Sequence, residues 1–373
     1  MTQHSADAEN PGPVDLAVVS HSCVRVTNQS VYEEIARNRT VALLVPDRWR
    51  DEYAPDGFKP VFAPGLAQTA RSLRIALPGR PQRHFYVANP IATLKHLAPS
   101  HLLIEQEPYS LSALEWGVSA ARLGVPFSLR VAENMERTLP PPVKAWTRYL
   151  LKRAQWVMGC GEGTRELMAR WGAGSRSVVV PLSVPAWSEP NAPLEGHAIF
   201  TVGYAGRLTK PKGVYDLVQA MEMMQHPARV IFIGDGAERT PLAATPGVTV
   251  QPERQDEKIR EAYRQLDVLV VPSRTTPTWK EQFGRVIVEA LWSGVPVVGS
   301  DSGEIPNLIE TTGGGRIFPE GDVARLADIL DELARDPAQR ATLAQAGQRA
   351  AMERYSPRAV AQTIETLLFP TQG

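Results

Sequence analysis

The sequence has few of the features that tie a protein to an oxidised compartment, a metal ion or a membrane. Cys23 and Cys160 are its two cysteines in 373 residues, too few and too far apart for a disulfide framework. We therefore expect a reducing compartment, the cytoplasm. No CxxC pair or Cys/His cluster indicates a metal site. No apolar run is long enough to span a bilayer.

The chain also lacks a net charge and a targeting segment. Its 40 basic residues balance its 40 acidic ones, so nothing in the overall charge predicts a nucleic-acid partner. Residues 1–13 are polar, contain Pro11 and Pro13, and have no apolar core. We interpret them as a disordered lead-in rather than a signal peptide.

Several catalytic motifs are missing as well. The chain has no phosphate-binding P-loop, no HExxH zinc motif and no nucleophile elbow. Gly234 and Gly236 follow an apolar run, but Arg239 stands where a dinucleotide fingerprint needs a third glycine. A nicotinamide-dependent oxidoreductase is therefore the weakest interpretation of the chain.

Short β-branched runs alternate with amphipathic stretches along the whole sequence. Such alternation predicts an α/β protein with parallel sheets that helices cover on both faces. We expect strands in the first half at 16–19, 41–45, 84–87, 102–104, 127–131, 156–158 and 178–182. In the second half we expect them at 199–204, 230–233, 248–250, 268–271, 295–298 and 316–318. Helices are expected at 214–224 and from an N-cap at Asp322.

The length of the chain and a proline-rich segment near its middle indicate two domains. A chain of 373 residues exceeds one typical core, and residues 185–196 hold three prolines and a glycine before a new strand. We predict a lead-in at 1–13, a first Rossmann-like domain at 14–188 and a second at 197–356. A final helical segment is expected at 357–373.

The most informative segment covers residues 280–298. Seven residues, among them Phe283 and Gly284, separate Glu281 from Glu289, and an apolar helix follows the Phe-Gly pair. Gly284 lets the backbone approach a ligand, and the helix N-terminus offers amide groups to an anion. The carboxylates can accept hydrogen bonds from hydroxyls. This chemistry suits a sugar carried on a phosphate, although the bare spacing also fits two solvated helix carboxylates.

A second candidate site follows the strand expected at 199–204. Gly206 ends that run, and Arg207 and Lys212 come before the next helix. At the carboxyl end of a parallel strand, an arginine fork and a lysine charge can hold a diphosphate. A solvated basic loop is an equally good interpretation of these residues taken alone.

Together, residues 200–213 and 268–298 resemble the donor-binding half of the GT-B retaining glycosyltransferases of family 4. The resemblance includes the Pro272-Ser273 turn after a strand and the carboxylate pair flanking Phe283-Gly284. It implies two Rossmann-like domains facing a cleft, with the helix at 357–368 crossing back to the first domain. It also implies that Glu253 and Arg254 lie near the nucleotide base.

The resemblance assigns a role to each candidate residue. Arg207 and Lys212 would hold the diphosphate and offset its charge as the bond to the sugar breaks. Glu281 would bind hydroxyls of the donor sugar, and Glu289 those of the ribose. The remaining donor-binding candidates are Gly206, Gly234, Phe283, Gly284 and Arg285.

The first domain is harder to interpret. His21 and Glu105 each follow an expected strand and are candidates for the cleft that binds the acceptor. Many family members carry a histidine after the strand at 127–131, but this chain has Ala132, Glu133 and Asn134. We expect Glu133, Asn134 or Glu105 to replace that histidine, or the acceptor to be bound differently.

Residues 140–157 combine basic and aromatic side chains. A helix at a membrane surface, reaching a lipid-linked acceptor at the inner face, is one interpretation. An ordinary amphipathic helix with its cations in solvent is the one we favour, because its apolar residues suffice for core contacts.

The expected activity is retaining, metal-independent transfer of a sugar from a nucleotide-diphosphate sugar to a hydroxyl of a carbohydrate or glycoconjugate, in polysaccharide or glycoconjugate biosynthesis. No cofactor is expected beyond the donor substrate. The alternatives are a GT-B epimerase or phosphorylase, and a non-catalytic partner protein that binds sugar nucleotides. No motif specifies the base, the sugar or the acceptor.

Overall fold

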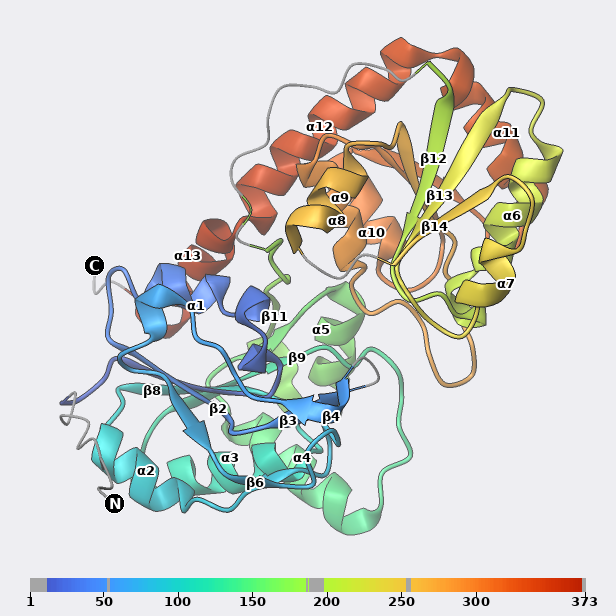
Figure 1. The fold of residues 1–373 in the computed structure, drawn as a ribbon. Helices are drawn as coiled ribbons and strands as arrows, with labels where there is room; N and C mark the ends of the chain where they lie inside the picture. Colours follow the sequence, from blue (N-terminus) through green and yellow to red (C-terminus); the bar gives the residue numbers. More distant parts are fainter. Residues whose placement is uncertain (1–11, 52–53, 186, 188–197, 253–255, 371–373) are drawn as a thin grey trace, which may run out of the picture.

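The computed structural model describes residues 12–51, 54–185, 187, 198–252 and 256–370. Most of the expected lead-in at 1–13 and most of the expected domain boundary at 185–196 lie outside these residues. Glu253 and Arg254, expected near the base, also lie outside them. The described residues form two parallel sheets with helices on their faces (Figure 1), which confirms the predicted fold class.

The first sheet has seven parallel strands in the order β11-β10-β9-β8-β1-β2-β5. They are β1 (Leu16–Ser20), β2 (Val41–Pro46), β5 (Arg71–Leu73), β8 (His101–Glu105), β9 (Phe127–Val131), β10 (Val157–Gly159) and β11 (Ser177–Val179). Every residue of β1, β2 and β9 is buried, as expected of strands covered on both faces.

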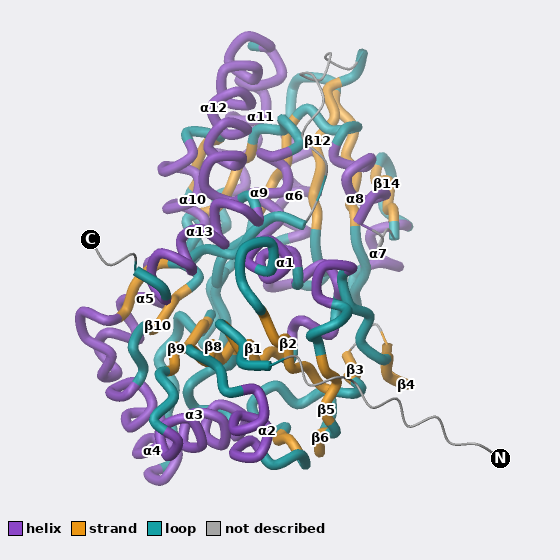
Figure 2. The backbone as a smooth tube through the Cα atoms, turned by 90° about the vertical axis from the view of Figure 1, so that its left-hand side faces the viewer, coloured by secondary structure: helices purple, strands orange, loops and turns teal. Residues whose placement is uncertain are grey.

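The helices of the first domain are short or amphipathic. They are α1 (Ser30–Ile35), α2 (Pro90–Leu97), α3 (Leu111–Leu123), α4 (Pro141–Arg153) and α5 (Glu162–Met168). Figure 2 shows α2, α3 and α4 on one side of the first sheet. Ser110 caps α3 by accepting a hydrogen bond from the Ala113 amide, and Gly124 ends that helix in a left-handed conformation.

Two strand predictions in this half need correction. The run expected as a parallel strand at 84–87 is β7 (Phe85–Tyr86), which pairs antiparallel with β6 (Ile75–Ala76) outside the main sheet. The strand expected at 178–182 ends at Val179 in β11. A further two-stranded ribbon joins β3 (Trp49–Asp51) and β4 (Ala54–Phe58).

The second sheet has six parallel strands in the order β14-β13-β12-β15-β16-β17. They are β12 (Phe200–Ala205), β13 (Ala228–Ile233), β14 (Val248–Gln251), β15 (Val268–Val271), β16 (Val297–Ser300) and β17 (Gly315–Phe318). Their helices are α6 (Val214–Met223), α7 (Arg239–Ala243), α8 (Asp256–Tyr263), α9 (Arg285–Trp292), α10 (Ile305–Thr312), α11 (Val323–Arg335) and α12 (Pro337–Tyr355). Asp322 caps α11 as the sequence predicts.

The last helix, α13 (Pro357–Leu368), leaves the second domain and packs beside α1 of the first (Figure 1). Its buried side chains, Val360, Ala361, Ile364 and Leu368, belong to the core of the first domain. The Trp156 indole N–H donates to the Leu367 carbonyl at 2.9 Å. The C-terminal residues therefore complete a core that begins more than three hundred residues earlier.

Replacing Ile364 by alanine should destabilise the first domain by about 2–5 kcal/mol, because the side chain is fully buried and would leave a cavity. Urea denaturation measures the change. Thr366→Ala, on the exposed face of the same helix, is the control and should change stability little. Equal effects of the two substitutions would contradict the packing of α13 described above.

Candidate functional site

The carboxyl ends of the two sheets face each other, and hydrogen bonds join the loops that follow them. In each bond one partner lies in a loop after β1, β9 or β10, and the other lies between β15 and the start of α9. The three pairs are Arg285 Nη1 to Asn28 Oδ1 at 3.0 Å, Asn134 Nδ2 to the Glu281 carbonyl at 2.8 Å, and Cys160 Sγ to the Gln282 carbonyl at 3.4 Å. The loop at 281–285 is thus one part of the second domain that meets the first.

The Glu281 side chain forms a partly buried ion pair with Lys212. Its Oε2 accepts hydrogen bonds from Lys212 Nζ at 2.7 Å and from Ser273 Oγ at 2.9 Å. The Lys212 ammonium also lies 4.5 Å from the centroid of the Trp279 ring, a cation–π geometry. No described residue donates to Oε1 of Glu281, so that oxygen can accept a hydrogen bond from a ligand hydroxyl.

The backbone of Glu281 is held as firmly as its side chain. Its carbonyl accepts from Asn134 Nδ2 and also from the Glu304 amide at 3.2 Å. Gly303 makes this approach possible, because a Cβ atom there would stand 2.0 Å from the same carbonyl oxygen. Asn134, a predicted cleft residue, is therefore in contact with the predicted sugar-binding residue.

Glu289 is buried in α9, where its Oε2 accepts a hydrogen bond from the Tyr263 hydroxyl at 3.0 Å. Burial raises the pKa of Tyr263 well above its usual value, so this hydroxyl is a donor at neutral pH. Gly284 precedes α9 as its N-cap with a φ of 83°, and no side chain caps the helix. The first amides of α9 thus lie next to Glu281 without a side-chain cap, as an anion site requires.

Arg207, Gly206 and Gly234 lie at the carboxyl ends of the adjacent strands β12 and β13. The Arg207 side chain is exposed, and its carbonyl accepts from the Tyr204 hydroxyl at 2.7 Å. Gly234 must lack a side chain, because a Cβ atom would lie 2.0 Å from the Gly206 carbonyl oxygen. The two glycines let neighbouring loops pack closely beside the predicted diphosphate site.

Two of the cleft candidates in the first domain are tied into internal networks. His21 packs against Trp49 and His84, with ring centroids 5.0 and 5.5 Å away, and burial lowers its pKa to about 4. Its imidazole is therefore neutral at pH 7. Glu105 accepts hydrogen bonds from Ser22 Oγ at 2.9 Å and from the Tyr32 hydroxyl.

The loop after β9, where family members carry a histidine, is shaped by a carboxylate that the sequence analysis did not single out. Glu107 Oε1 accepts from the amides of Ala132 and Glu133 at 2.9 and 3.1 Å. Burial raises the pKa of Glu107 to about 7, and the Glu133 charge adds to this, although the two amides act in the opposite direction. Glu133 itself accepts from Tyr109 and Arg137 at 2.8 and 2.6 Å.

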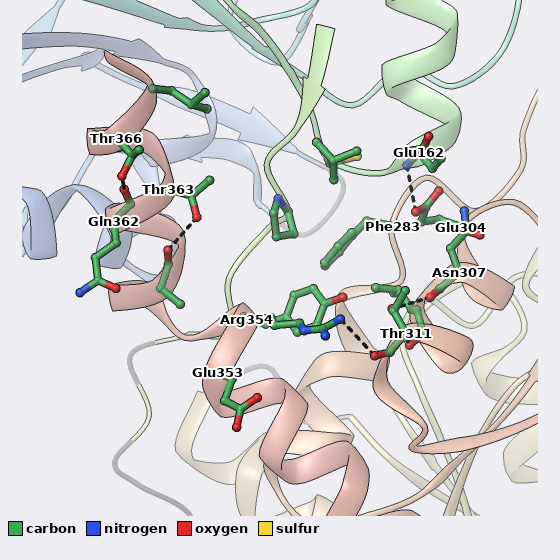
Figure 3. A pocket seen from close by; sticks show the side chains of 17 residues that line it. Glu162, Phe283, Glu304, Asn307, Thr311, Glu353, Arg354, Gln362, Thr363 and Thr366 are labelled. Carbon is green, nitrogen blue, oxygen red and sulfur yellow. Dashed lines mark hydrogen bonds between the residues drawn. The ribbon is translucent and has the colours of Figure 1, made fainter. Parts of the chain in front are cut away.

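A cavity of about 870 Å³ lies elsewhere. It is bounded by α5, α10, the end of α12 and α13 (Figure 3). Phe283 is the one predicted donor residue on its wall. Beside it the Glu304 carboxylate accepts from the Glu162 amide at 3.0 Å (Figure 3), so it caps a helix of the other domain. Lys212, Glu281 and Glu289 do not line this cavity.

Sequence reasoning missed several partners of the site. Ser273 and Trp279 surround the Lys212–Glu281 pair, and Tyr263 holds Glu289. Ser273 had a usable signal, because it directly follows a buried strand in a parallel sheet. Tyr263 and Glu304 had none, since their contacts arise from chain segments that meet only in the folded protein.

The known proteins that this chain resembles in sequence are glycosyltransferases. Residues 199–336 match the family model of the glycosyl transferases group 1. A D-inositol 3-phosphate glycosyltransferase from Xylanimonas cellulosilytica is 33% identical over 164 residues, 41% of this chain and 38% of that protein. A 2-deoxystreptamine glucosyltransferase from Streptomyces kanamyceticus is 27% identical over 279 residues, 66% of this chain and 71% of that protein. The chain thus matches well under half the length of the first relative.

Solved structures extend the likeness to the whole chain. Anabaena HepE in complex with UDP and glucose has a TM-score of 0.69 at 18% identity, over 96% of this chain and all of that one. A glycosyltransferase from Rickettsia africae has a TM-score of 0.71 at 13% identity, over the same shares. The chain has the GT-B glycosyltransferase fold, and its second domain carries the group 1 signature. The match over residues 199–336 agrees with the resemblance seen in the sequence of the second half.

Membrane spans are a separate matter. Within the described residues, no helix combines the length and the apolar character needed to cross a bilayer.

Replacing Glu107 by glutamine should remove a pH-dependent part of the folding free energy. The folded pKa of about 7 lies above the ordinary 4.5, so the folded state binds more protons between these values. Stability from this group is therefore full below pH 4.5 and is lost as the pH rises towards 7. Between pH 5 and pH 8, the free energy of unfolding of the variant should rise relative to that of the wild type by at most about 3 kcal/mol.

Urea denaturation of both proteins at the two pH values tests this expectation. The difference isolates Glu107 from Glu115, whose pKa burial also raises to about 7. A difference that stays constant with pH would show that the Glu107 carboxyl titrates as it does in the unfolded chain.

Proposed function

We propose that the protein transfers a sugar from a nucleotide-diphosphate sugar to a hydroxyl acceptor, with retention of the anomeric configuration and without a metal ion. One observation carries the proposal. The Lys212–Glu281 ion pair lies beside the N-terminus of α9, and the first domain contacts Glu281 through Asn134. Three kinds of group therefore lie together between the domains. They are a cation, the uncapped amides of a helix, and a carboxylate oxygen to which no described residue donates.

In this proposal the donor diphosphate binds between the positive groups. Lys212 supplies a point charge, Arg207 a second cation at the next loop, and the first amides of α9 the positive end of a helix dipole. Each such contact stabilises the negative charge that grows on the leaving diphosphate. Removing one preorganised donor of this kind raises the activation free energy by about 3–4 kcal/mol. Protein cations thus take the place of a divalent metal.

The sugar would lie against Glu281, whose Oε1 accepts from its hydroxyls, while Glu289 binds the ribose. Retention follows if the acceptor hydroxyl attacks the face that the diphosphate leaves, and the departing phosphate takes the proton. That scheme fits a first-domain cleft where Glu105 and Glu133 are already hydrogen-bonded and His21 is neutral and stacked. None of these three cleft candidates is therefore free to act as a strong base.

The acceptor is a carbohydrate or a glycoconjugate at the cytoplasmic side, in the biosynthesis of a polysaccharide or a glycoconjugate. The two relatives are named for inositol phosphate and deoxystreptamine, which, like carbohydrates, are ring compounds that carry several hydroxyl groups. A non-catalytic partner that binds sugar nucleotides is the second candidate, because Ala132 offers the donor no side-chain hydrogen bond.

The donor site predicts a selective response to nucleotides in a thermal-shift screen of nucleoside diphosphates and their sugars. A matching nucleotide at about one hundred times its Kd should stabilise the fold by about 2.7 kcal/mol. Arg207→Ala and Lys212→Ala should each remove most of this shift. Lys210→Ala is the control, because it removes an exposed cation from the same loop. Indifference of the wild type to every nucleotide would contradict the proposed donor site.

Glu281→Gln should reduce transfer at least a hundredfold while leaving the fold intact, because the amide keeps the shape but weakens the contacts to Lys212 and the sugar. Turnover is measured as release of free nucleoside diphosphate, and nuclear magnetic resonance of the product reads the anomeric configuration. An inverted product would contradict retention. Nucleotide binding without turnover over a broad acceptor panel would favour the non-catalytic alternative.

A further inference from the structure

A second charged cavity, of about 350 Å³, lies on the first domain, between α4, the loop that precedes it and the turn at Ala169–Ala173. Its ionisable lining comprises four cations and a single carboxylate: Arg137, Lys144, Arg148, Arg170 and Glu136. The whole chain has equal numbers of acidic and basic residues, so this excess is local. Such a cavity attracts an anion.

Two of the four cations are free to bind an anion. Glu136 accepts from Trp171 Nε1 at 2.8 Å and from Arg170 at 3.3 Å, so the one carboxylate is already engaged. The side chains of Lys144 and Arg148 are exposed, and within the described part of the chain neither side chain makes a hydrogen bond or an ion pair. They stand four residues apart on α4, where like charges face each other and repel. A bound anion would relieve that repulsion.

Side-chain contacts connect the cavity to the predicted sugar site. Trp171, on the cavity wall, packs edge-on against Tyr109 with ring centroids 6.3 Å apart. The Tyr109 hydroxyl donates to Glu133, and the next residue, Asn134, donates to the Glu281 carbonyl. Arg137 reaches Glu133 from the cavity side. An acceptor anchored in the cavity could therefore extend past the two aromatic rings to the donor sugar.

We propose that this cavity binds a phosphate group carried by the acceptor. The inference rests on the proposed function, because it names the chemical class of the acceptor for that reaction. A cavity of this size accommodates a phosphate and part of the group that carries it. The Arg148 guanidinium and the Lys144 ammonium provide the directed and undirected positive charge that binds a phosphate. Anchoring the phosphate would hold the acceptor hydroxyl towards Glu281.

Fluorine nuclear magnetic resonance of protein labelled with 5-fluorotryptophan tests the proposal at two sites at once. Trp171 reports on the cavity and Trp279, which lies over Lys212, reports on the donor site. Trp171→Phe and Trp279→Phe assign the two signals among the eight tryptophans. Glucose 6-phosphate should shift the Trp171 signal in a saturable manner, and glucose should not.

A matched pair of double variants locates the effect. Lys144→Ala with Arg148→Ala should weaken the response of Trp171 to glucose 6-phosphate at least tenfold. Lys152→Ala with Arg153→Ala removes the same charge from the other end of α4, outside the cavity, and should leave the response unchanged. Equal loss in both variants would reduce the effect to general charge attraction and overturn the proposal.

The two reporters separate failure of this inference from failure of the proposed function. If Trp279 responds to a nucleotide but Trp171 ignores phosphate esters, the phosphate site is contradicted and the donor site stands. If Trp171 responds to phosphate but Trp279 ignores every nucleotide, the cavity binds anions and its role in the proposed reaction is contradicted.

A vesicle experiment distinguishes a phosphate on a soluble acceptor from one on a lipid surface. Co-sedimentation is measured with phosphatidylcholine vesicles, with and without phosphatidylglycerol, for the wild type and both double variants. The proposal expects the soluble phosphate ester to move Trp171 without vesicles. Vesicle binding that depends on Lys144 and Arg148, with no response to the soluble ester, would assign the cations to membrane docking and overturn the proposal.

Discussion

The arrangement of the donor site depends on the ion pair between Lys212 and Glu281. Two charges this far from water are costly unless each finds a partner, and here each has one at 2.7 Å. Ser273 and the Trp279 ring complete the surroundings of the pair. Loss of either charge would leave the other poorly solvated. The pair therefore fixes the loop after β12 against the loop after β15.

Contacts between the domains extend this constraint. Asn134 and Cys160 of the first domain donate hydrogen bonds to the loop at 281–285 of the second. Glu304 of the second domain in turn caps α5 of the first. The backbone of Glu281 is thus held from both sides of the cleft. In a GT-B enzyme, closure of the domains would then set the position of the sugar-binding carboxylate as well as exclude water. The helix α13 keeps the two domains together during such motion, because its side chains belong to the first core.

Much of the architecture could be predicted from local pattern. Strands 127–131 and 268–271 have the expected bounds. Val268–Val271 is a continuous apolar run with three β-branched residues, which is typical of a strand buried on both faces. The short edge strand β5 was missed, because Arg71–Leu73 carries a charge and has no apolar run. The strand expected at 84–87 was misassigned because a strand as short as β7 has too few residues to distinguish an antiparallel ribbon from a parallel strand. The candidate donor residues came from spacing and resemblance. Asn134 holding Glu281 could not be predicted, since that contact spans 147 residues.

The most direct test of the central claim is a crystal structure of the protein with a bound nucleoside diphosphate. The account predicts that the phosphates lie against Lys212 and the first amides of α9, with Glu281 turned towards the position of the sugar. Phosphates bound elsewhere, such as in the large cavity between α10 and α13, with Lys212 and Glu281 still paired and untouched, would contradict it.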